Sequence, residues 1–302
     1  MATFVILGGT GNLGEPLATL VEEYKDAYPV IRFTTRDPAS AKAKELVALG
    51  AHAFAFSDPL DTILAGAAVV ASIIPTATEA TILPELVPAM VRNGVQVFFT
   101  SEYGNDLRNI NFPGYEHPDW AGKLANRATA IALAKGSDLI LIPVATGVFM
   151  PWAAHMSVDW AAGSTIGFSP GRRMATTDLP DIARALARLA VLARDPATRA
   201  SVPSAEGGVR IASQFITSAE VVEAVKKAKG VELTVTPFDA EQSRETLKAI
   251  YPPKELSAFV LYAGVLIEEG LADYSADCHN ELVNPGEKYW KWKTFEELLR
   301  ST

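Results

Sequence analysis

Glycines at a regular spacing of three follow the first apolar run of the chain. Residues 3–7 read Thr-Phe-Val-Ile-Leu, and residues 8–14 then read Gly-Gly-Thr-Gly-Asn-Leu-Gly. Such a G-x-x-G-x-x-G turn permits close approach of the backbone to a pyrophosphate and close packing of a helix on a strand. A helix that begins here would also offer free N–H groups to a phosphate. A purely structural turn is the alternative, but the position between a strand and a helix favours a dinucleotide site. The contacts predicted there are Gly8, Thr10, Gly11, Asn12, Leu13 and Gly14.

The segment after the second predicted strand indicates which dinucleotide would bind. That strand ends in Phe-Thr-Thr-Arg-Asp-Pro at residues 33–38, where an NAD-specific protein normally carries an acidic residue for the ribose hydroxyls. The Arg36 guanidinium can instead pair with a 2′-phosphate and stack on adenine, and Ser40 and Lys42 can add to that site. Asp37 partly cancels this charge or offers an alternative ribose acceptor. The sequence therefore predicts NADPH over NADH, unless Arg36 is an ordinary solvated charge.

A second group of polar residues follows the fifth predicted strand. Residues 101–104 read Ser-Glu-Tyr-Gly, and Lys123 lies on the next predicted helix, four residues before Arg127. The Tyr-x-x-x-Lys pair of the common short-chain dehydrogenases occurs only at Tyr289 and Lys293. That position is far beyond the predicted sheet, so we interpret the spacing as a coincidence.

These motifs together resemble the NmrA-like and isoflavone-reductase-like branch of the atypical short-chain dehydrogenases. Members of that branch have a Gly-Gly-Thr-Gly-x-x-Gly turn, an arginine after the second strand, a Ser-Glu-Phe/Tyr-Gly motif, and a lysine four residues before an arginine. All four features occur here in that order within the first 150 residues. Asn284-Pro285-Gly286 and residues 292–297 are similar to the C-terminal end of the family, though less specifically.

The resemblance implies that Lys123 is the catalytic residue. An ammonium beside the nicotinamide could donate a proton or a hydrogen bond to an oxygen on which charge develops. Partial desolvation near other cations would lower the pKa of Lys123 and let it act as a base. Without the motif, an ordinary surface lysine would be the expected interpretation, and Glu102 would be expected to anchor its loop.

The resemblance also implies cofactor contacts at the ends of the fourth and sixth predicted strands. Open α/β sheets bind ligands at the carboxyl ends of their strands, and both segments lie there. Relatives often carry Cys or Asn near position 146, where this chain has Thr. The additional cofactor contacts expected are Ile74, Pro75, Ser101, Lys123, Thr146, Gly147 and Phe149.

Aromatic and sulfur-containing side chains crowd the segment 151–174, which shows no clear periodicity. Trp160 and Phe168 belong to this group, which suits a planar or aromatic substrate. Packing between two lobes would explain any one of them equally well. Tyr115 and His117 are expected as polar partners near the pocket. The predicted substrate contacts are Tyr103, Tyr115, Phe149, Trp152, His155 and Met156.

Elements that could position these residues alternate through the first half of the chain. Short apolar runs alternate with helical stretches, which predicts a Rossmann-type, doubly wound parallel sheet covered by helices on both faces. Strands are predicted at 3–7, 30–34, 52–56, 68–73, 95–100 and 139–143, and helices at 13–25, 39–49, 79–92 and 121–135.

Beyond residue 150 the alternation loosens. Helices are predicted at 178–194, 218–229, 241–250 and 254–269, and a strand at 231–236. We expect an α/β fold with an NADP-binding Rossmann domain over 1–150, extended by 176–215. A smaller α+β substrate-binding lobe would comprise 151–175 and 216–302.

Composition excludes several other classes of protein. The 302 residues carry 27 Lys and Arg against 35 Asp and Glu, and the net charge of −8 would repel nucleic acid. One cysteine and four scattered histidines argue against a disulfide framework and a metal site. No stretch has the apolar length or flanks of a membrane span or signal peptide, so we expect a cytoplasmic monomer or homodimer.

The function predicted is an NADPH-dependent reductase of a small aromatic or heterocyclic metabolite, with Lys123 as the acid/base group. Two alternatives remain open at this point. The chain could be a non-catalytic NADP(H) sensor that regulates partners, as some NmrA-like proteins are. It could also be a non-redox enzyme, for example one of cyclisation or condensation, because the proton-transfer apparatus would look the same.

Overall fold

The chain divides into two compact units. The computed structural model describes residues 2–14, 16, 20–205, 207–253 and 257–302. Unit 1 comprises Met1–Glu102, Gly122–Val144 and Ile182–Val209, and unit 2 comprises Tyr103–Ala121, Ala145–Asp181 and Arg210–Thr302. Among the described residues, no helix is both long and apolar enough to cross a membrane.

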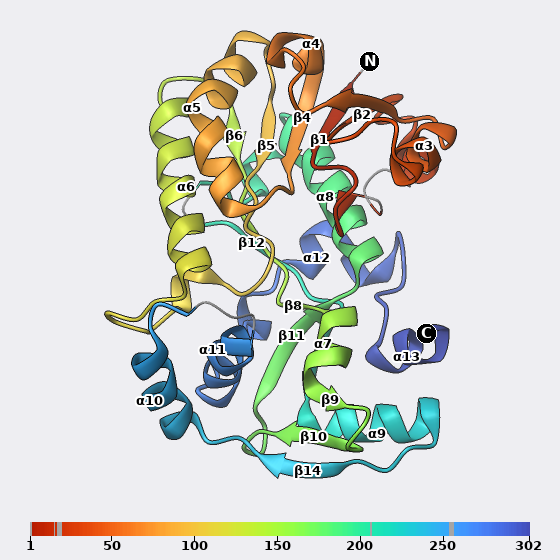
Figure 1. Ribbon diagram of the computed structural model, residues 1–302. Coiled ribbons are helices and arrows are strands. Elements are labelled where there is room, and N and C mark those ends of the chain that lie inside the picture. The colour runs from red at the N-terminus through yellow and green to blue at the C-terminus, as the bar shows by residue number, and fades with distance from the viewer. Residues whose placement is uncertain (1, 15, 17–19, 206, 254–256) are drawn as a thin grey trace. The chain divides into compact units, whose positions relative to one another are not determined.

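Unit 1 is built on a six-stranded parallel sheet with the order β3-β2-β1-β4-β5-β6 (Figure 1). The order reverses between β1 and β4, which is the topological switch point where Rossmann-like sheets bind ligands at their carboxyl ends. The predicted fold class is confirmed. The strands are β1 (Thr3–Leu7), β2 (Val30–Thr35), β3 (His52–Ala55), β4 (Ala67–Ser72), β5 (Val97–Phe99) and β6 (Ile140–Leu141).

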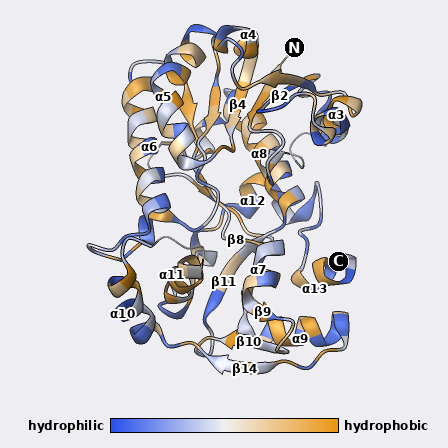
Figure 2. Cartoon of the chain, in the orientation of Figure 1, coloured by the Kyte–Doolittle hydropathy of each residue, from blue (hydrophilic) through white to orange (hydrophobic). Residues whose placement is uncertain are grey.

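Helices cover this sheet because alternate strand residues are apolar on both faces. Side chains of α5 and α6 pack with Val5, Val70 and Phe98 in one buried cluster. Most of β4 is coloured as hydrophobic in Figure 2. The predicted helix over 13–25 includes residues 15 and 17–19, which lie outside the described residues. The described helices of this unit are α2 (Val21–Tyr24), α3 (Ala41–Ala48), α4 (Leu60–Leu64), α5 (Thr76–Arg92), α6 (Pro118–Ala134, from Gly122 onward), α8 (Leu179–Arg194, from Ile182 onward) and η2 (Arg199–Ser201).

Unit 2 contains short elements that the sequence did not reveal. The segment 151–174 shows no clear periodicity in the sequence, yet most of it is regular secondary structure. It forms α7 (Met150–Ser157), β9 (Val158–Asp159) and β10 (Ser164–Gly167), and leads into β11 (Arg173–Thr177). Strands of two to five residues are too short for a visible period, and sheet pairing with distant segments stabilises them.

Two small sheets organise these strands. β10 lies between β14 (Thr234–Pro237) and β9, and β11 lies between β13 (Gln214–Thr217) and β8 (Val148–Phe149). The helix predicted at 218–229 is α9 (Ser218–Lys229), and Thr217 and Glu220 close its first turn as a reciprocal capping box. β7 (Val144–Ala145) and β12 (Val209–Arg210) lie where the chain passes from one unit to the other.

The core of unit 2 is largely aromatic. Phe112 lies 4.8 Å from Tyr262 and 5.7 Å from Tyr115 between ring centroids, and Trp120 packs beside them. α11, almost uniformly hydrophobic, contributes Tyr262 (Figure 2). Residues 254–256 of its predicted range lie outside the described residues. The remaining elements are η1 (Leu107–Asn109), α10 (Ala240–Ile250), α11 (Ser257–Glu268), η3 (Ser275–Asp277), α12 (Asn280–Val283), η4 (Pro285–Glu287) and α13 (Phe295–Ser301).

The close contact between the first turn and β2 generates a stability prediction. A Cβ on Gly9 would lie 2.4 Å from Phe33 Cβ, so Gly9→Ala must displace the turn or the ring. We expect the substitution to lower the free energy of unfolding by about 1–3 kcal/mol, as overpacking does, in urea titrations followed by circular dichroism. Gly207→Ala is the matched control, because its nearest neighbour would be 3.6 Å away. Equal stabilities of the two variants would contradict the prediction.

Candidate active site

The glycine turn is held by two threonines at the end of β2. The Gly8 N–H donates to Thr34 Oγ1 (3.0 Å), and the Gly9 N–H donates to the Thr34 carbonyl (2.9 Å). Thr10 Oγ1 lies 3.1 Å from Thr35 Oγ1. Both strand threonines are buried. The strand end that lacks the acidic residue therefore carries hydroxyls that fasten the turn.

The glycines of the turn differ in how closely neighbouring atoms would approach a Cβ added at each position. A Cβ on Gly14 would lie 2.3 Å from the Gly9 carbonyl carbon, and one on Gly8 would lie 3.0 Å from Ile74 Cγ2 with φ at +92°. At Gly11 the nearest atom, the Gly8 carbonyl oxygen, would be 3.2 Å away. Internal packing thus restricts Gly11 least. A side chain there would fill the space in which a ligand could approach the backbone, which fits a pyrophosphate.

Arg36 lies just beyond this turn with its side chain exposed. Asp37, its acidic neighbour, is engaged locally, because Asp37 Oδ1 accepts the Ala39 N–H at 2.8 Å. Ser40 donates to the Asp37 carbonyl at 2.8 Å and accepts the Ala43 N–H at 3.3 Å, so it caps α3. Among the described residues, none forms a hydrogen bond or ion pair with the Arg36 guanidinium. Lys42 is half-buried in the first turn of α3.

The ends of β4 and β5 extend the site away from the glycine turn. Ser101 Oγ donates to the Ile74 carbonyl at 2.8 Å, and Ile74 is the residue that a Cβ on Gly8 would meet. Pro75 follows as the N-cap of α5. The structure therefore brings the predicted residues Gly8, Ile74, Pro75 and Ser101 together at one edge of the sheet.

A buried ion pair joins this edge to α6. Arg127 Nε lies 2.9 Å from both carboxylate oxygens of Glu102, and its Nη2 also donates to Oε2. Thr100 Oγ1 donates to Glu102 Oε1 at 2.8 Å. The Glu102 side chain is 2% exposed and that of Arg127 is 13% exposed. The forked geometry fixes both the position and the rotation of the helix at Arg127.

A second buried carboxyl, Glu79 of α5, was not singled out by the sequence. Its Oε1 accepts the Ser101 N–H at 3.1 Å, and its Oε2 accepts from Asn126 Nδ2 at 3.2 Å. Burial raises the pKa of Glu79, and the hydrogen bonds it accepts oppose that rise. The available signal was a glutamate four residues before Leu83, on the stripe of α5 that is otherwise apolar and buried.

Lys123 is half-buried on α6 beside these two anchors. Asn126 Nδ2 also donates to the Thr76 carbonyl at 2.9 Å, and a Cβ on Gly122 would lie 2.8 Å from Thr76 Cγ2. The helix thus approaches the start of α5 closely at the residue before Lys123. Asn126 and Arg127, three and four residues after Lys123, are bonded to α5 and to Glu102 beyond β5, and they hold the helical turn on which Lys123 lies.

Within unit 2, two predicted segments meet at the Gly104 carbonyl. It accepts the N–H groups of Thr146 (2.9 Å) and Gly147 (2.8 Å). Gly147 has φ at +63°, and a Cβ there would lie 2.1 Å from the Ala175 carbonyl oxygen. The Thr146 hydroxyl is fully buried and donates to the Gly147 carbonyl at 3.3 Å. Phe149 is partly buried at the end of β8.

The predicted substrate residues of unit 2 do not gather in one place. Tyr115 belongs to the buried aromatic core, and its hydroxyl accepts from Arg244 Nη1 at 2.6 Å. Met156 lines a cavity, whereas His155 lies in a separate surface hollow with Trp160. Trp152 is 40% exposed. Tyr103 is buried. His117 packs against Tyr262, with 5.1 Å between ring centroids.

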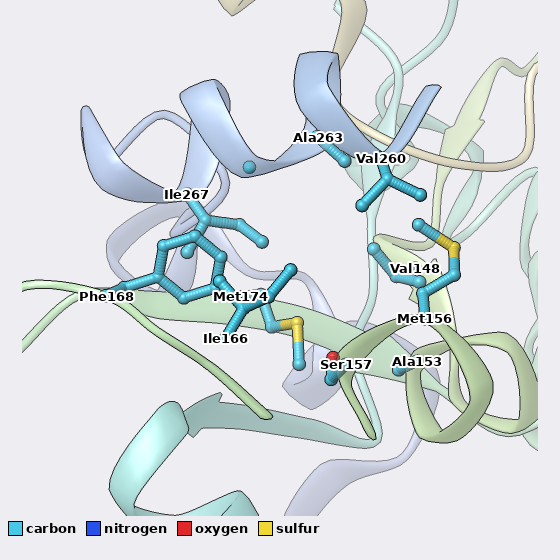
Figure 3. Close-up of a pocket in the computed structure, with 11 residues that line it drawn as sticks. Val148, Ala153, Met156, Ser157, Ile166, Phe168, Met174, Val260, Ala263 and Ile267 are labelled. Carbon is cyan, nitrogen blue, oxygen red and sulfur yellow. The ribbon is translucent and has the colours of Figure 1, made fainter. Parts of the chain in front are cut away.

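The cavity that Met156 lines is almost wholly apolar (Figure 3). It has a volume of about 30 Å³, and Phe168, Met174 and Ile267 form much of its wall. Ser157 contributes its one hydroxyl. A space of this kind admits a small apolar group and would exclude a charged one, which would lose its hydration there.

Comparison with known proteins gives one family and a set of similar folds. The model of the NmrA-like family matches residues 1–299. A search of curated proteins finds no significant match. A crystal structure of isoflavone reductase superposes with a TM-score of 0.77 and 19% identity over 99% of this chain and 98% of that chain. Leucoanthocyanidin reductase from Vitis vinifera in complex with NADPH gives 0.76 and 17% over 99% of each.

A third similar structure contains both a cofactor and a small molecule. AtPrR2 with NADP+ and (+)-pinoresinol has a TM-score of 0.75 and 20% identity to this chain, and covers 99% of this chain and 98% of that chain. At these identities the likeness is one of fold.

The Glu102–Arg127 pair generates a prediction about stability. Arg127→Ala leaves a buried carboxylate without its cation, and we expect it to lower the free energy of unfolding by about 3–5 kcal/mol. Arg127→Lys keeps the positive charge but cannot form the forked pair of hydrogen bonds, so we expect a smaller decrease in the free energy of unfolding. Urea unfolding followed by tryptophan fluorescence measures both.

The control for this comparison is Arg300→Ala. Arg300 forms an ion pair with Glu296 on α13, at 2.8 Å, but its side chain is 57% exposed. Pairs of this kind are worth about 0–1 kcal/mol. If Arg127→Ala lowers the free energy of unfolding no more than Arg300→Ala does, the buried pair does not stabilise the fold.

Proposed function

Because the chain belongs to the NmrA-like family, we propose that it is an NADPH-dependent reductase of a small aromatic or heterocyclic metabolite, with Lys123 as the acid/base group. One observation carries this proposal. In unit 1 the glycine turn contacts Ile74, Ile74 contacts Ser101, and the same strand ends anchor the helical turn that bears Lys123. A dinucleotide cradle and a half-buried amine thus share one edge of the sheet.

The residues present fit an NADP(H) molecule. The space beside Gly11 would receive the pyrophosphate, and the exposed Arg36 would bind the 2′-phosphate. The local turn that engages Asp37 supports this choice, since a carboxylate held by Ala39 is less available to a ribose. The other proposed contacts in unit 1 are Gly8, Thr10, Asn12, Leu13, Gly14, Lys42, Ile74, Pro75, Ser101 and Lys123. Thr146, Gly147 and Phe149 are proposed on the family resemblance.

The similar folds support both the cofactor and the reaction class. The structures of AtPrR2 and of leucoanthocyanidin reductase contain NADP+ and NADPH, respectively. A further similar fold, from Escherichia coli, is an NADPH-dependent quinone oxidoreductase, with a TM-score of 0.67 and 17% identity. These proteins share the architecture in which we propose the cofactor site.

The chemistry follows from an amine held at a fixed place. When bound, the reduced nicotinamide would supply a hydride. The Lys123 ammonium would donate a proton, or a hydrogen bond, to the substrate oxygen on which negative charge develops. The bonds of Asn126 and Arg127 hold the helical turn from which the Lys123 side chain extends.

The substrate class rests on the residues of unit 2 that the sequence singled out. The apolar cavity lined by Met156 and Phe168 would itself accommodate a small apolar group. Tyr103, Tyr115, Phe149, Trp152 and His155 remain predicted contacts. The exposed position of Trp152 and the buried bond of Tyr115 to Arg244 make these two the weakest candidates.

The proposal is tested by cofactor binding and by turnover of a metabolite panel. NADPH fluorescence should change on binding, and Lys123→Ala should lower turnover by roughly 10²–10⁴-fold, the usual contribution of a general acid or base, with NADPH affinity nearly unchanged. Lys135→Ala, just beyond the end of α6, is the control. Wild-type turnover in Lys123→Ala would remove this residue from the mechanism.

The same experiment separates the alternatives. Absence of NADPH binding would overturn the proposal altogether. Binding without turnover of any panel member would favour a sensor of NADP(H). Conversion of a panel member without a change in nicotinamide absorbance would favour non-redox chemistry in the same pocket.

Cofactor choice gives a separate prediction at Arg36. Loss of its charge-assisted hydrogen bonds should cost about 1.5–3 kcal/mol, so Arg36→Ala should weaken NADPH binding by roughly 10–100-fold. NADH lacks the 2′-phosphate, and its affinity should change little. Calorimetric titration of both nucleotides measures the difference. Arg92→Ala, an exposed arginine paired with Asp61 on the same unit, is the control. Equal weakening of both nucleotides would contradict a 2′-phosphate contact.

A further inference from the structure

Glu79 is a buried carboxyl that the proposed chemistry does not use. It is fully buried on α5, and the groups that donate to it from Ser101 and Asn126 are neutral. A carboxyl in such a place loses hydration that these bonds only partly replace. The positions that follow on the same stripe are filled by apolar residues. Packing alone therefore does not require a glutamate at this position.

The contacts of Glu79 bridge three elements of unit 1. One carboxylate oxygen accepts the Ser101 N–H at the end of β5, and the other accepts from the Asn126 amide of α6. The same Asn126 amide nitrogen donates to the Thr76 carbonyl at the start of α5. These directional bonds hold α6 against the start of α5 and, through Glu79, against the end of β5.

Asn126 lies on α6 next to Arg127, so the contact with Glu79 acts on the same helical turn as the Glu102–Arg127 pair. Asn126 and Arg127 are adjacent, so their side chains leave the helix about 100° apart. The Asn126–Glu79 bond and the Arg127–Glu102 pair together restrain both the sliding and the rotation of α6. Lys123 precedes these residues by three and four positions, and residues at these spacings share one helix face.

We propose that Glu79 and Asn126 are positioning residues for Lys123, which hold the turn of α6 that carries the amine against the start of α5 and the end of β5. This role rests on the function proposed for Lys123. Neither residue needs to touch a substrate or cofactor. Their effect on the reaction would pass through the place and the accessibility of the Lys123 amine.

The test measures the Lys123 amine directly. Competitive acylation with acetic anhydride, followed by mass spectrometry of the peptide that contains Lys123, gives its reaction rate at each pH relative to Lys135. In Glu79→Gln, an NH₂ group replaces one acceptor oxygen and faces a donor. We expect the half-buried amine to become more accessible, with an acylation rate raised by about threefold or more and a displaced pH profile; threefold corresponds to about 0.6 kcal/mol.

Two further variants separate positioning from general loosening. Asn126→Asp places a carboxylate against Glu79 and should also alter the profile of Lys123. The double variant Glu79→Gln with Asn126→Asp restores a hydrogen bond of reversed direction and should return at least half of the change, although Thr76 loses its donor. Glu85→Gln, an exposed glutamate on the same helix, is the matched control and should behave as wild type.

The outcomes are decisive in either direction. A folded Glu79→Gln protein with the wild-type acylation profile at Lys123 would overturn the proposal, as would a double variant no closer to wild type than the single ones. If Glu79→Gln does not fold, Asn126→Ser removes the amide donor and leaves the carboxyl, and the same rate decides the question.

The measurement also keeps this proposal distinct from the proposed function. Acylation of Lys123 needs no cofactor or substrate, so it reports on positioning even if NADPH does not bind. A changed profile in Glu79→Gln, combined with wild-type turnover in Lys123→Ala, would leave the positioning contact intact and remove the catalytic role.

Discussion

The buried ion pair between Glu102 and Arg127 is the contact on which the rest of the site depends. It connects the residue after the Ser101 turn at the end of β5 to the helix that carries Lys123, through a forked geometry that allows little rotation. Breaking it would leave the buried Glu102 carboxylate without its cation, which would destabilise the fold. The glycine turn is connected to the same edge through Ile74 and Ser101. The segments after β4 and β5 thus connect the glycine turn with the helix that carries Lys123.

Much of unit 1 could be predicted from the sequence because its signals are local. Apolar runs such as residues 3–7 and helices such as 41–48 are long enough to show their periods. The strand order, and with it the switch point, is known only from the pairing in the structure. The contacts of Glu79 could not be predicted, because its partners Ser101 and Asn126 are 22 and 47 residues away along the chain. The short strands of unit 2 escaped for the same reason, since their partners lie far away in sequence.

The surroundings of the predicted substrate residues were the hardest feature of the structure to predict from the sequence. Composition indicated a cluster of aromatic and sulfur-containing side chains after residue 150, but not which faces of the elements carry them. α7 separates Met156, which lines the apolar cavity, from His155, which lies in a surface hollow. Adjacent residues on a helix point about 100° apart, so a run that looks uniform in sequence divides between different surroundings once the helix forms. Without the helix, no argument from residue type could have made that division.

The net charge of the chain does not prevent the glycine turn from binding a small anion. A chain with a net charge of −8 repels polyanions at a distance, yet screening confines that field to about one Debye length, about 8 Å at physiological salt. A small anion at the glycine turn would instead meet the open backbone beside Gly11, with the exposed Arg36 just beyond the end of β2. The capture of Asp37 by the Ala39 N–H reduces the acidic competition at that point. Short-range donors of this kind would bind the phosphate of the proposed dinucleotide despite the net negative charge of the chain.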